Sequence, residues 1–271
     1  MRKLSVIFGA VGLVVSLATS ASAAHLGLVP DNGCIIYNGV YICDADVQPT
    51  GTGIFNPFLR TNPGGNLSPS SGWNTDANKQ GWTQPNDADD AWTSALATSS
   101  LANADGYFVF TVDINQQGQE GDDSSLLSLA HFQLFSCATP TYTSLSGCTS
   151  EFNLFGGSIT YDASGRPIIS SQEWVDFNYR HHEGSGSGDI SIFIPVGELA
   201  GAGPYLALLD GWGQPGEYED NDGFQEWRAL QGTNQCIEGC DVITAEPASI
   251  LLFGLAAFGG AYRMRRKQTA S

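Results

Sequence analysis

The sequence predicts an all-β protein: a single β-sandwich of jelly-roll type with long loops, followed by a hydrophobic C-terminal helix. Three observations favour this class. Short runs rich in aromatic and β-branched residues recur along the chain, and segments rich in Gly, Ser, Asn and Asp separate them. The middle of the chain shows no internal repeat and no linker between domains. An apolar run near the end of the chain predicts the helix.

The N-terminal segment, residues 1–23, is predicted to be a secretory signal peptide. Arg2 and Lys3 provide the positive start, residues 4–17 are apolar, and residues 21–23 (Ala-Ser-Ala) form a small-residue cleavage site. The mature chain is therefore expected to start at Ala24, and residues 24–244 to form one extracellular domain.

The strands of this domain are predicted from local patterns. Residues 35–43 are expected to form a hairpin, because Asn38-Gly39 suits a type I′ turn. The strongest strand is predicted at 107–114. Further strands are predicted at 129–135, 158–161, 174–179, 190–194 and 204–209. The polar segment 57–90 is interpreted as a long surface loop, and 91–101 as a candidate short helix.

The charge of this domain excludes one class of partner. Of the 11 Lys and Arg residues, six lie in the two terminal segments, whereas only one of the 28 acidic residues does. Residues 24–244 thus carry 5 basic and 27 acidic side chains, a net charge of −22. Such a surface repels nucleic acid and anionic membranes, and it suits divalent cations or solubility in a salty medium.

Six cysteines lie in this domain as three close pairs: Cys34 and Cys43, Cys137 and Cys148, Cys236 and Cys240. An even number in an exported chain favours three local disulfides. A metal site is the alternative, but the spacings differ from those of zinc-binding motifs. Connectivity does not follow from sequence alone.

The densest acidic segment spans residues 217–227. Asp220, Asp222 and Glu226 are the candidate ligands of a calcium ion there, with Gly223 allowing a tight turn. The spacing is not that of an EF-hand. The alternative is a solvated loop that Phe224 and Trp227 attach to the core.

No catalytic residue is assigned, and the protein is predicted not to be an enzyme. Phosphate-binding, dinucleotide-binding and nucleophile-elbow motifs are absent from the sequence. Glu173 and Glu226 are the carboxylates to test for glycan hydrolysis. A carbohydrate-binding module, with calcium as an optional cofactor, is the alternative function. Four tryptophans in polar surroundings could stack on sugars or plug loops onto the core: Trp73, Trp82, Trp92 and Trp212.

The C-terminal segment, residues 245–267, combines three features. Glu246-Pro247 precedes an uncharged apolar run at 248–262, and a basic cluster follows it: Arg263, Arg265, Arg266 and Lys267. The run is short for a bilayer, which needs ~20 residues, but interfacial and snorkelling side chains extend its reach. The basic cluster favours the cytoplasmic side. A buried helix of a globular domain is the alternative.

This segment resembles the PEP-CTERM sorting signal of Gram-negative bacteria, with Ala245-Glu246-Pro247 in place of Pro-Glu-Pro. The resemblance implies export, transient anchoring by the C-terminal helix, and processing by an inner-membrane exosortase. It also implies association with exopolysaccharide or biofilm. The expected function is that of a non-catalytic protein of the cell surface or extracellular matrix.

Overall fold

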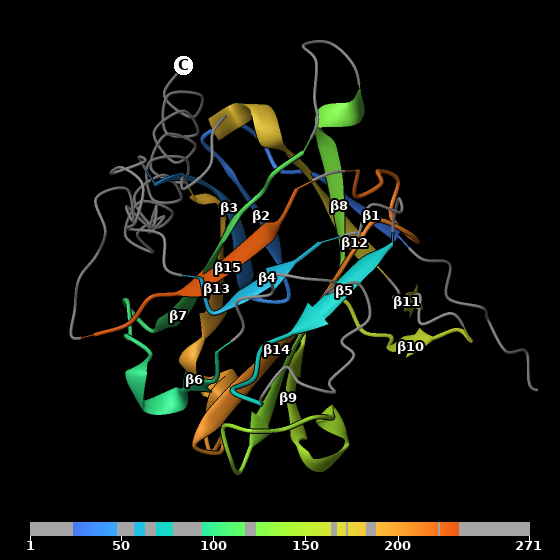
Figure 1. Cartoon of the computed structure of the whole chain (residues 1–271). Helices are drawn as coiled ribbons and strands as arrows, with labels where there is room; N and C mark the ends of the chain where they lie inside the picture. Colours follow the sequence, from blue (N-terminus) through green and yellow to red (C-terminus); the bar gives the residue numbers. More distant parts are fainter. Residues whose placement is uncertain are drawn as a thin grey trace, which may run out of the picture.

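The computed structural model describes residues 24–47, 57–62, 69–77, 94–116, 123–163, 167–171, 173–182, 188–221 and 223–232. Over these ranges the chain consists mostly of β-strands, which confirms the predicted all-β class (Figure 1). The signal segment 1–23, the sorting segment 245–267 and the cysteines Cys236 and Cys240 lie outside them. Among the helices of the described ranges, none has the length and apolarity to cross a membrane.

The larger sheet, sheet A, has seven strands, and five of them form the path β1-β12-β8-β14-β5. Their bounds are β1 (Ala24–Leu28), β12 (Glu173–Asn178), β8 (Leu126–Cys137), β14 (Tyr205–Trp212) and β5 (Ser70–Trp73). The other two are β6 (Leu96–Ala97), which pairs with β14, and β9 (Thr149–Asn153), which pairs with β8. β1 is parallel to β12, and the other neighbours are antiparallel.

Sheet B has six strands, all paired antiparallel, in the order β2-β3-β13-β7-β15-β4. Their bounds are β2 (Cys34–Tyr37), β3 (Val40–Val47), β13 (Gly188–Pro195), β7 (Tyr107–Asp113), β15 (Gln225–Ala229) and β4 (Leu59–Thr61). The described ranges also contain five 3-10 helices: η1 (Thr98–Ser100), η2 (Asp123–Ser125), η3 (Leu145–Gly147), η4 (Tyr179–His182) and η5 (Val196–Leu199).

The two sheets share one hydrophobic core. Phe132 of β8 packs edge-on against Phe110 of β7 at 5.9 Å and against Trp227 of β15 at 5.3 Å between ring centroids. Trp212 of β14 lies 5.9 Å from Trp227. Each such aromatic side chain buries ~150–250 Å², so these contacts across the sheets contribute strongly to stability.

The predicted hairpin 35–43 is present as β2 and β3. Asn38 and Gly39 have positive φ values of 50° and 82°, as a type I′ turn requires. Cys34 lies opposite Cys43 in the strand register and forms a disulfide with it. A second disulfide joins Cys137, the last residue of β8, to Cys148, just before β9.

The prediction of a loop at 57–90 was wrong for two segments, and the prediction of a helix at 91–101 was wrong for the residues that the structure describes. β4 and β5 lie inside the predicted loop 57–90, and Leu59 and Ser70 are fully buried. Residues 94–101 contain β6 and η1 instead of an α-helix. The physical reason is non-local: β4 pairs with β15, and β5 and β6 pair with β14, so short segments with weak strand patterns complete the sheets.

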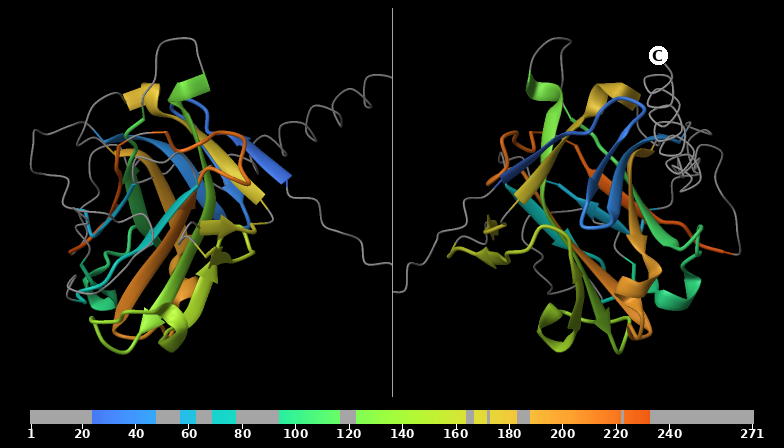
Figure 2. Two further views of the ribbon diagram at one scale, coloured as in Figure 1. Left: turned by 45° about the vertical axis from the view of Figure 1, so that its right-hand side comes forward. Right: turned by 180° about the vertical axis from the view of Figure 1, so that it is seen from behind.

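A small ribbon covers part of the outer face of sheet A. It consists of β10 (Ile159–Tyr161) and β11 (Pro167–Ile169), visible at one side of the molecule in Figure 2. A Cβ atom at Gly211 of β14 would lie 2.9 Å from the side-chain ends of Ile159 and Ile169. The absence of a side chain at Gly211 therefore allows the ribbon to lie directly on β14.

Candidate functional site

The acidic loop 217–227 does not place its predicted calcium ligands in one environment. Asp220 is fully buried and accepts hydrogen bonds from Ser70, Gln116 and Gln225. Burial raises its pKa to about 7. Asp222 lies outside the described residues. The calcium site therefore stays a prediction.

Glu226, the third predicted ligand, lies on sheet B and already contacts a cation. Its carboxylate is 2.5 Å from Nε of Arg60, whose guanidinium also lies 5.8 Å from the ring centroid of Phe224. Glu173, the other carboxylate considered for glycan hydrolysis, lies on β12 of sheet A. The two carboxylates thus come from different sheets and different strands.

The predicted tryptophans differ in their exposure. Trp212 is fully buried between the sheets and is not accessible to a sugar, so for this residue the structure favours the alternative of a core position. Its polar, Gly-rich sequence surroundings did not reveal this, because the apolar partners come from other strands. Trp73 is 8% exposed, on the outer face of sheet A. Trp82 and Trp92 lie outside the described residues.

Asp210 of β14 is hydrogen-bonded to both buried indoles of the core. Its Oδ2 accepts hydrogen bonds from Nε1 of Trp212 at 2.8 Å and of Trp227 at 2.9 Å. Its Oδ1 accepts the Gly72 amide at 2.9 Å, and the Thr61 hydroxyl also donates to the carboxylate. Burial raises the pKa of Asp210 to about 6, while these donors hold it down.

An open pocket of about 450 Å³ lies on the outer face of sheet A. Its floor is a row of side chains across three strands: Trp73 of β5 and Gln133 of β8 both stand opposite Leu209 of β14 in the register. Residues of η3, β10 and the preceding loops form its walls. The full lining comprises Trp73, Gln133, Phe135, Thr143, Ser144, Leu145, Ser146, Gly157, Ser158, Ile159, Tyr161 and Leu209.

Two structural features hold the walls of this pocket. The disulfide Cys137–Cys148 closes the loop that carries Leu145 and the exposed hydroxyl groups around it. Tyr161 of β10 is hydrogen-bonded to Ser71 of β5 at 3.2 Å. The pocket is thus built on paired strands and a covalent loop, which limits its rearrangement when a ligand binds.

A buried histidine lies beside the pocket floor. His131 of β8 is fully buried, and its ring is 3.0 Å from Gln133 and 3.4 Å from Ser171. Burial lowers its pKa to about 4, so the ring is neutral at neutral pH. None of the described residues that line the pocket is charged.

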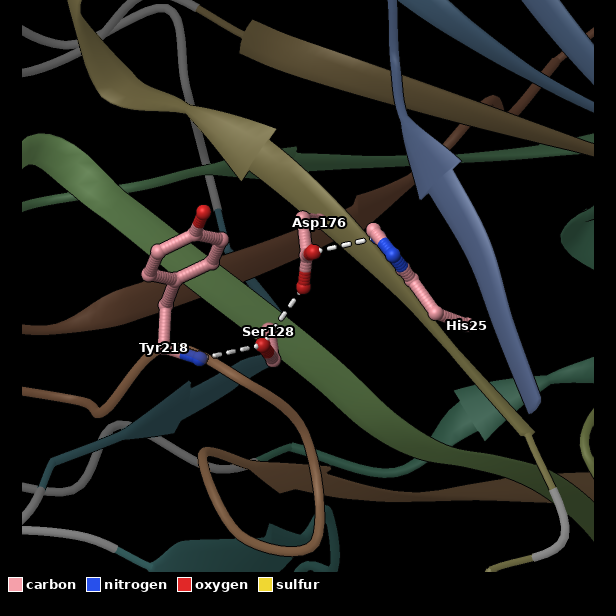
Figure 3. A network of polar contacts seen from close by, with 4 residues as sticks. All are labelled: His25, Ser128, Asp176 and Tyr218. Atoms are coloured by element: carbon pink, nitrogen blue, oxygen red, sulfur yellow. Dashed lines mark hydrogen bonds and ion pairs between the residues drawn. The ribbon is translucent and has the colours of Figure 1, made fainter. Parts of the chain in front are cut away.

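One group of described residues has a spacing suited to a metal ion: His25, Asp176 and Glu217. One ligand atom of each lies within 4.8 Å of those of the other two. Figure 3 shows His25 of β1 and Asp176 of β12 pointing toward each other. Sequence reasoning missed this group, although Asp176 stood in a predicted strand and Glu217 in the acidic segment.

Comparisons with protein-family models, with curated proteins and with the solved structures find no match for this chain.

Proposed function

We propose that this chain is an exported, non-catalytic protein of the cell surface or extracellular matrix that binds a neutral carbohydrate in the pocket of sheet A. The observation that carries this proposal is the uncharged, aromatic-floored pocket in a chain of net charge −17. Its volume of about 450 Å³ is within the range of small-molecule sites.

The lining of the pocket matches the chemistry of a sugar ring. A sugar presents C–H groups on its faces, which pack on aromatic and aliphatic side chains such as Tyr161, 36% exposed, and Ile159, above the largely buried Trp73. Its hydroxyl groups require donors and acceptors around the edge. The pocket provides these from the hydroxyls of Thr143, Ser144, Ser146 and Ser158 and from the amide of Gln133.

The proposal includes a single domain over residues 24–244, a β-sandwich of jelly-roll type. Two observations support it. Sheets A and B share one hydrophobic core. The consecutive strands β12, β13, β14 and β15 alternate between the two sheets, as strands do in sandwiches that connect across their core.

Calorimetric titration of the purified protein tests carbohydrate binding. The ligands are neutral oligosaccharides of glucose, galactose, mannose and N-acetylglucosamine, with oligouronates as acidic counterparts. We expect saturable binding of one neutral series and no binding of the oligouronates, because the domain is strongly acidic.

Two variants, each adding one tryptophan, locate the site. Ser146→Trp fills the mouth of the pocket from an exposed position and should weaken binding at least tenfold. Ile36→Trp, at a position of sheet B that is 64% exposed, should leave affinity unchanged. Failure of every neutral series to bind, or equal loss in both variants, would refute the carbohydrate proposal and favour a purely structural matrix protein.

The location of the protein is proposed from its two terminal segments, and the two disulfides of the described domain are compatible with export. An inner-membrane exosortase is the proposed processing partner, and exopolysaccharide the proposed matrix component. Cell fractionation should find the full chain at the surface or in the matrix. A chain ending at residue 244 should appear free in the medium. Identical distributions of the two would contradict the sorting role.

A calcium requirement is a separate part of the proposal. Thermal unfolding with millimolar calcium or with chelator tests this requirement. An ion that binds only the folded state, at a concentration ~100 times its Kd, adds about 2.7 kcal/mol to the free energy of unfolding. Asp222→Asn should abolish the shift if the acidic loop holds the ion. A shift that magnesium reproduces equally would speak against a specific calcium site.

A further inference from the structure

Three segments distant in sequence meet at one end of sheet A. β1 runs parallel to β12, with His25 opposite Trp174. Nε2 of His25 lies 2.5 Å from Oδ2 of Asp176, which is fully buried. The exposed Glu217 follows β14 in the chain and completes the group.

The loop that carries Glu217 is attached firmly to β8. The Ser128 carbonyl accepts the Gly213 amide at 2.8 Å, and the Ser128 hydroxyl accepts the Tyr218 amide at 2.8 Å (Figure 3). A Cβ at Gly216 would lie 2.2 Å from the Ser128 Cβ. Only glycine therefore lets the chain approach β8 closely enough to hold Glu217 in this position.

The other two members of the group are oriented as well. The Ser128 hydroxyl donates to Oδ1 of Asp176 at 2.6 Å, which directs Oδ2 toward His25. The ring of His25 is stacked on Trp174, with 5.8 Å between centroids and 9° between planes. A hydrogen-bonded partner such as Ser128 fixes the orientation of a metal-binding carboxylate, and the ring of Trp174 restricts the rotation of the imidazole.

Asp176 has no permanent cation among the charged groups of the described residues that act on it. The charged groups that act on Asp176 are His25 and Glu217, and Glu217 raises the pKa of Asp176 further. Oδ2 of Asp176 is buried and makes no hydrogen bond besides its ion-pair contact with His25. A buried carboxylate next to a second carboxylate is costly unless a cation neutralises them.

We propose that His25, Asp176 and Glu217 bind one divalent ion of the zinc class, which ties β1 and the loop after β14 to β12. One imidazole nitrogen and two carboxylates are ligands that zinc accepts, whereas calcium prefers six to eight oxygens. The side chain of His25 is 38% exposed, so solvent can complete the coordination.

Zinc binding requires only a small change in the distance between the ligand atoms. Two ligands of a tetrahedral zinc ion lie roughly 3.3 Å apart, given bonds of about 2.0 Å. Nε2 of His25 and Oδ2 of Asp176 are 2.5 Å apart, so the exposed imidazole would move outward to admit the ion.

Calorimetric titration of the full mature chain, stripped with chelator, tests this proposal without any sugar present. We expect one equivalent of ZnCl2 to bind more tightly than MnCl2 or CaCl2. His25→Gln and Glu217→Gln should each weaken zinc binding at least about tenfold, the loss typical when even an outer partner of a metal is removed. Both positions are exposed, so neither variant should lose the fold.

Glu219→Gln is the matched control, because it removes the same charge from an exposed position of the same loop outside the group. Its zinc affinity should equal that of the parent chain. Absence of zinc binding, unchanged affinity in His25→Gln, or an equal loss in Glu219→Gln would overturn the proposal. A preference for calcium over zinc would also overturn it, since it indicates an oxygen-only site.

Discussion

Replacing Asp210 with alanine tests whether the buried carboxylate holds the two sheets together. The substitution leaves three fixed donors without an acceptor: the Gly72 amide and the indoles of Trp212 and Trp227. Thr61, whose hydroxyl also donates, can rotate its hydroxyl elsewhere. The affected groups come from β5 and β14 of sheet A and from β4 and β15 of sheet B.

The expected magnitude follows from two opposing terms. Each buried donor left without a partner costs about 1–3 kcal/mol, so three cost about 6 kcal/mol at the middle of that range. Burial raises the pKa of Asp210 from 3.8 to about 6. Ionisation of Asp210 in the folded state at neutral pH therefore costs about 3 kcal/mol, which alanine relieves. We expect Asp210→Ala to lower the free energy of unfolding by about 3 kcal/mol.

Equilibrium unfolding in urea at pH 7, followed by tryptophan fluorescence and far-ultraviolet circular dichroism, measures this change. The native emission spectrum should also shift, because both buried indoles lose their acceptor. Thr61→Val is the control, since it removes one donor and leaves the carboxylate satisfied by the others; it should cost about 1 kcal/mol. A loss below 1 kcal/mol in Asp210→Ala, with an unshifted spectrum, would refute this role of the carboxylate.

Three further predictions concern local features of sheets A and B. The pKa of His131 falls from 6.5 to about 4 on folding. Its contribution to the free energy of unfolding is therefore fully present above about pH 6.5 and decreases by on the order of 3 kcal/mol as the pH drops to about 4. His131→Phe should remove this loss, so between pH 7 and pH 4.5 its urea midpoint should fall less than that of the parent chain. An equal fall of the midpoint in both chains would contradict the prediction. Gly211→Ala should cost roughly 1–3 kcal/mol, because its Cβ would push against Ile159 and Ile169 of the outer ribbon, and a melting temperature equal to that of the parent would count against this packing. Replacing both Cys34 and Cys43 with serine should cost about 2.5 kcal/mol, since the disulfide closes a short loop in the unfolded chain; no change in the urea midpoint would show that the hairpin does not need it.

Some of the fold could be predicted because its signals are local. Asn38-Gly39 specifies its turn through two positive φ values, and the cysteines on either side of it are neighbours across the hairpin. The strand 107–113 has aromatic and β-branched residues that suit a central position. The segments around Leu59 and Ser70 gave no such signal, because distant strands determine their pairing.

The candidate sites were less predictable, because each combines residues from distant segments. Trp73 reaches the pocket through β5, which the sequence pattern had placed in a loop. His25 and Glu217 are almost the whole domain apart in sequence, and only the parallel pairing of β1 with β12 and the close approach at Gly216 bring them to Asp176.

The sequence by itself determined the all-β class and the hairpin at Asn38-Gly39, because these depend on residues close along the chain, whereas the pairing of Cys34 with Cys43 and of Cys137 with Cys148 was shown by the structure. The tertiary structure alone decided which acidic side chains are buried. Asp210 and Asp220 are both buried, although Asp220 lies in the same acidic segment as the exposed Glu217 and Glu219. The reason is that a buried carboxylate needs donors, and here strands and loops far away in the sequence provide them.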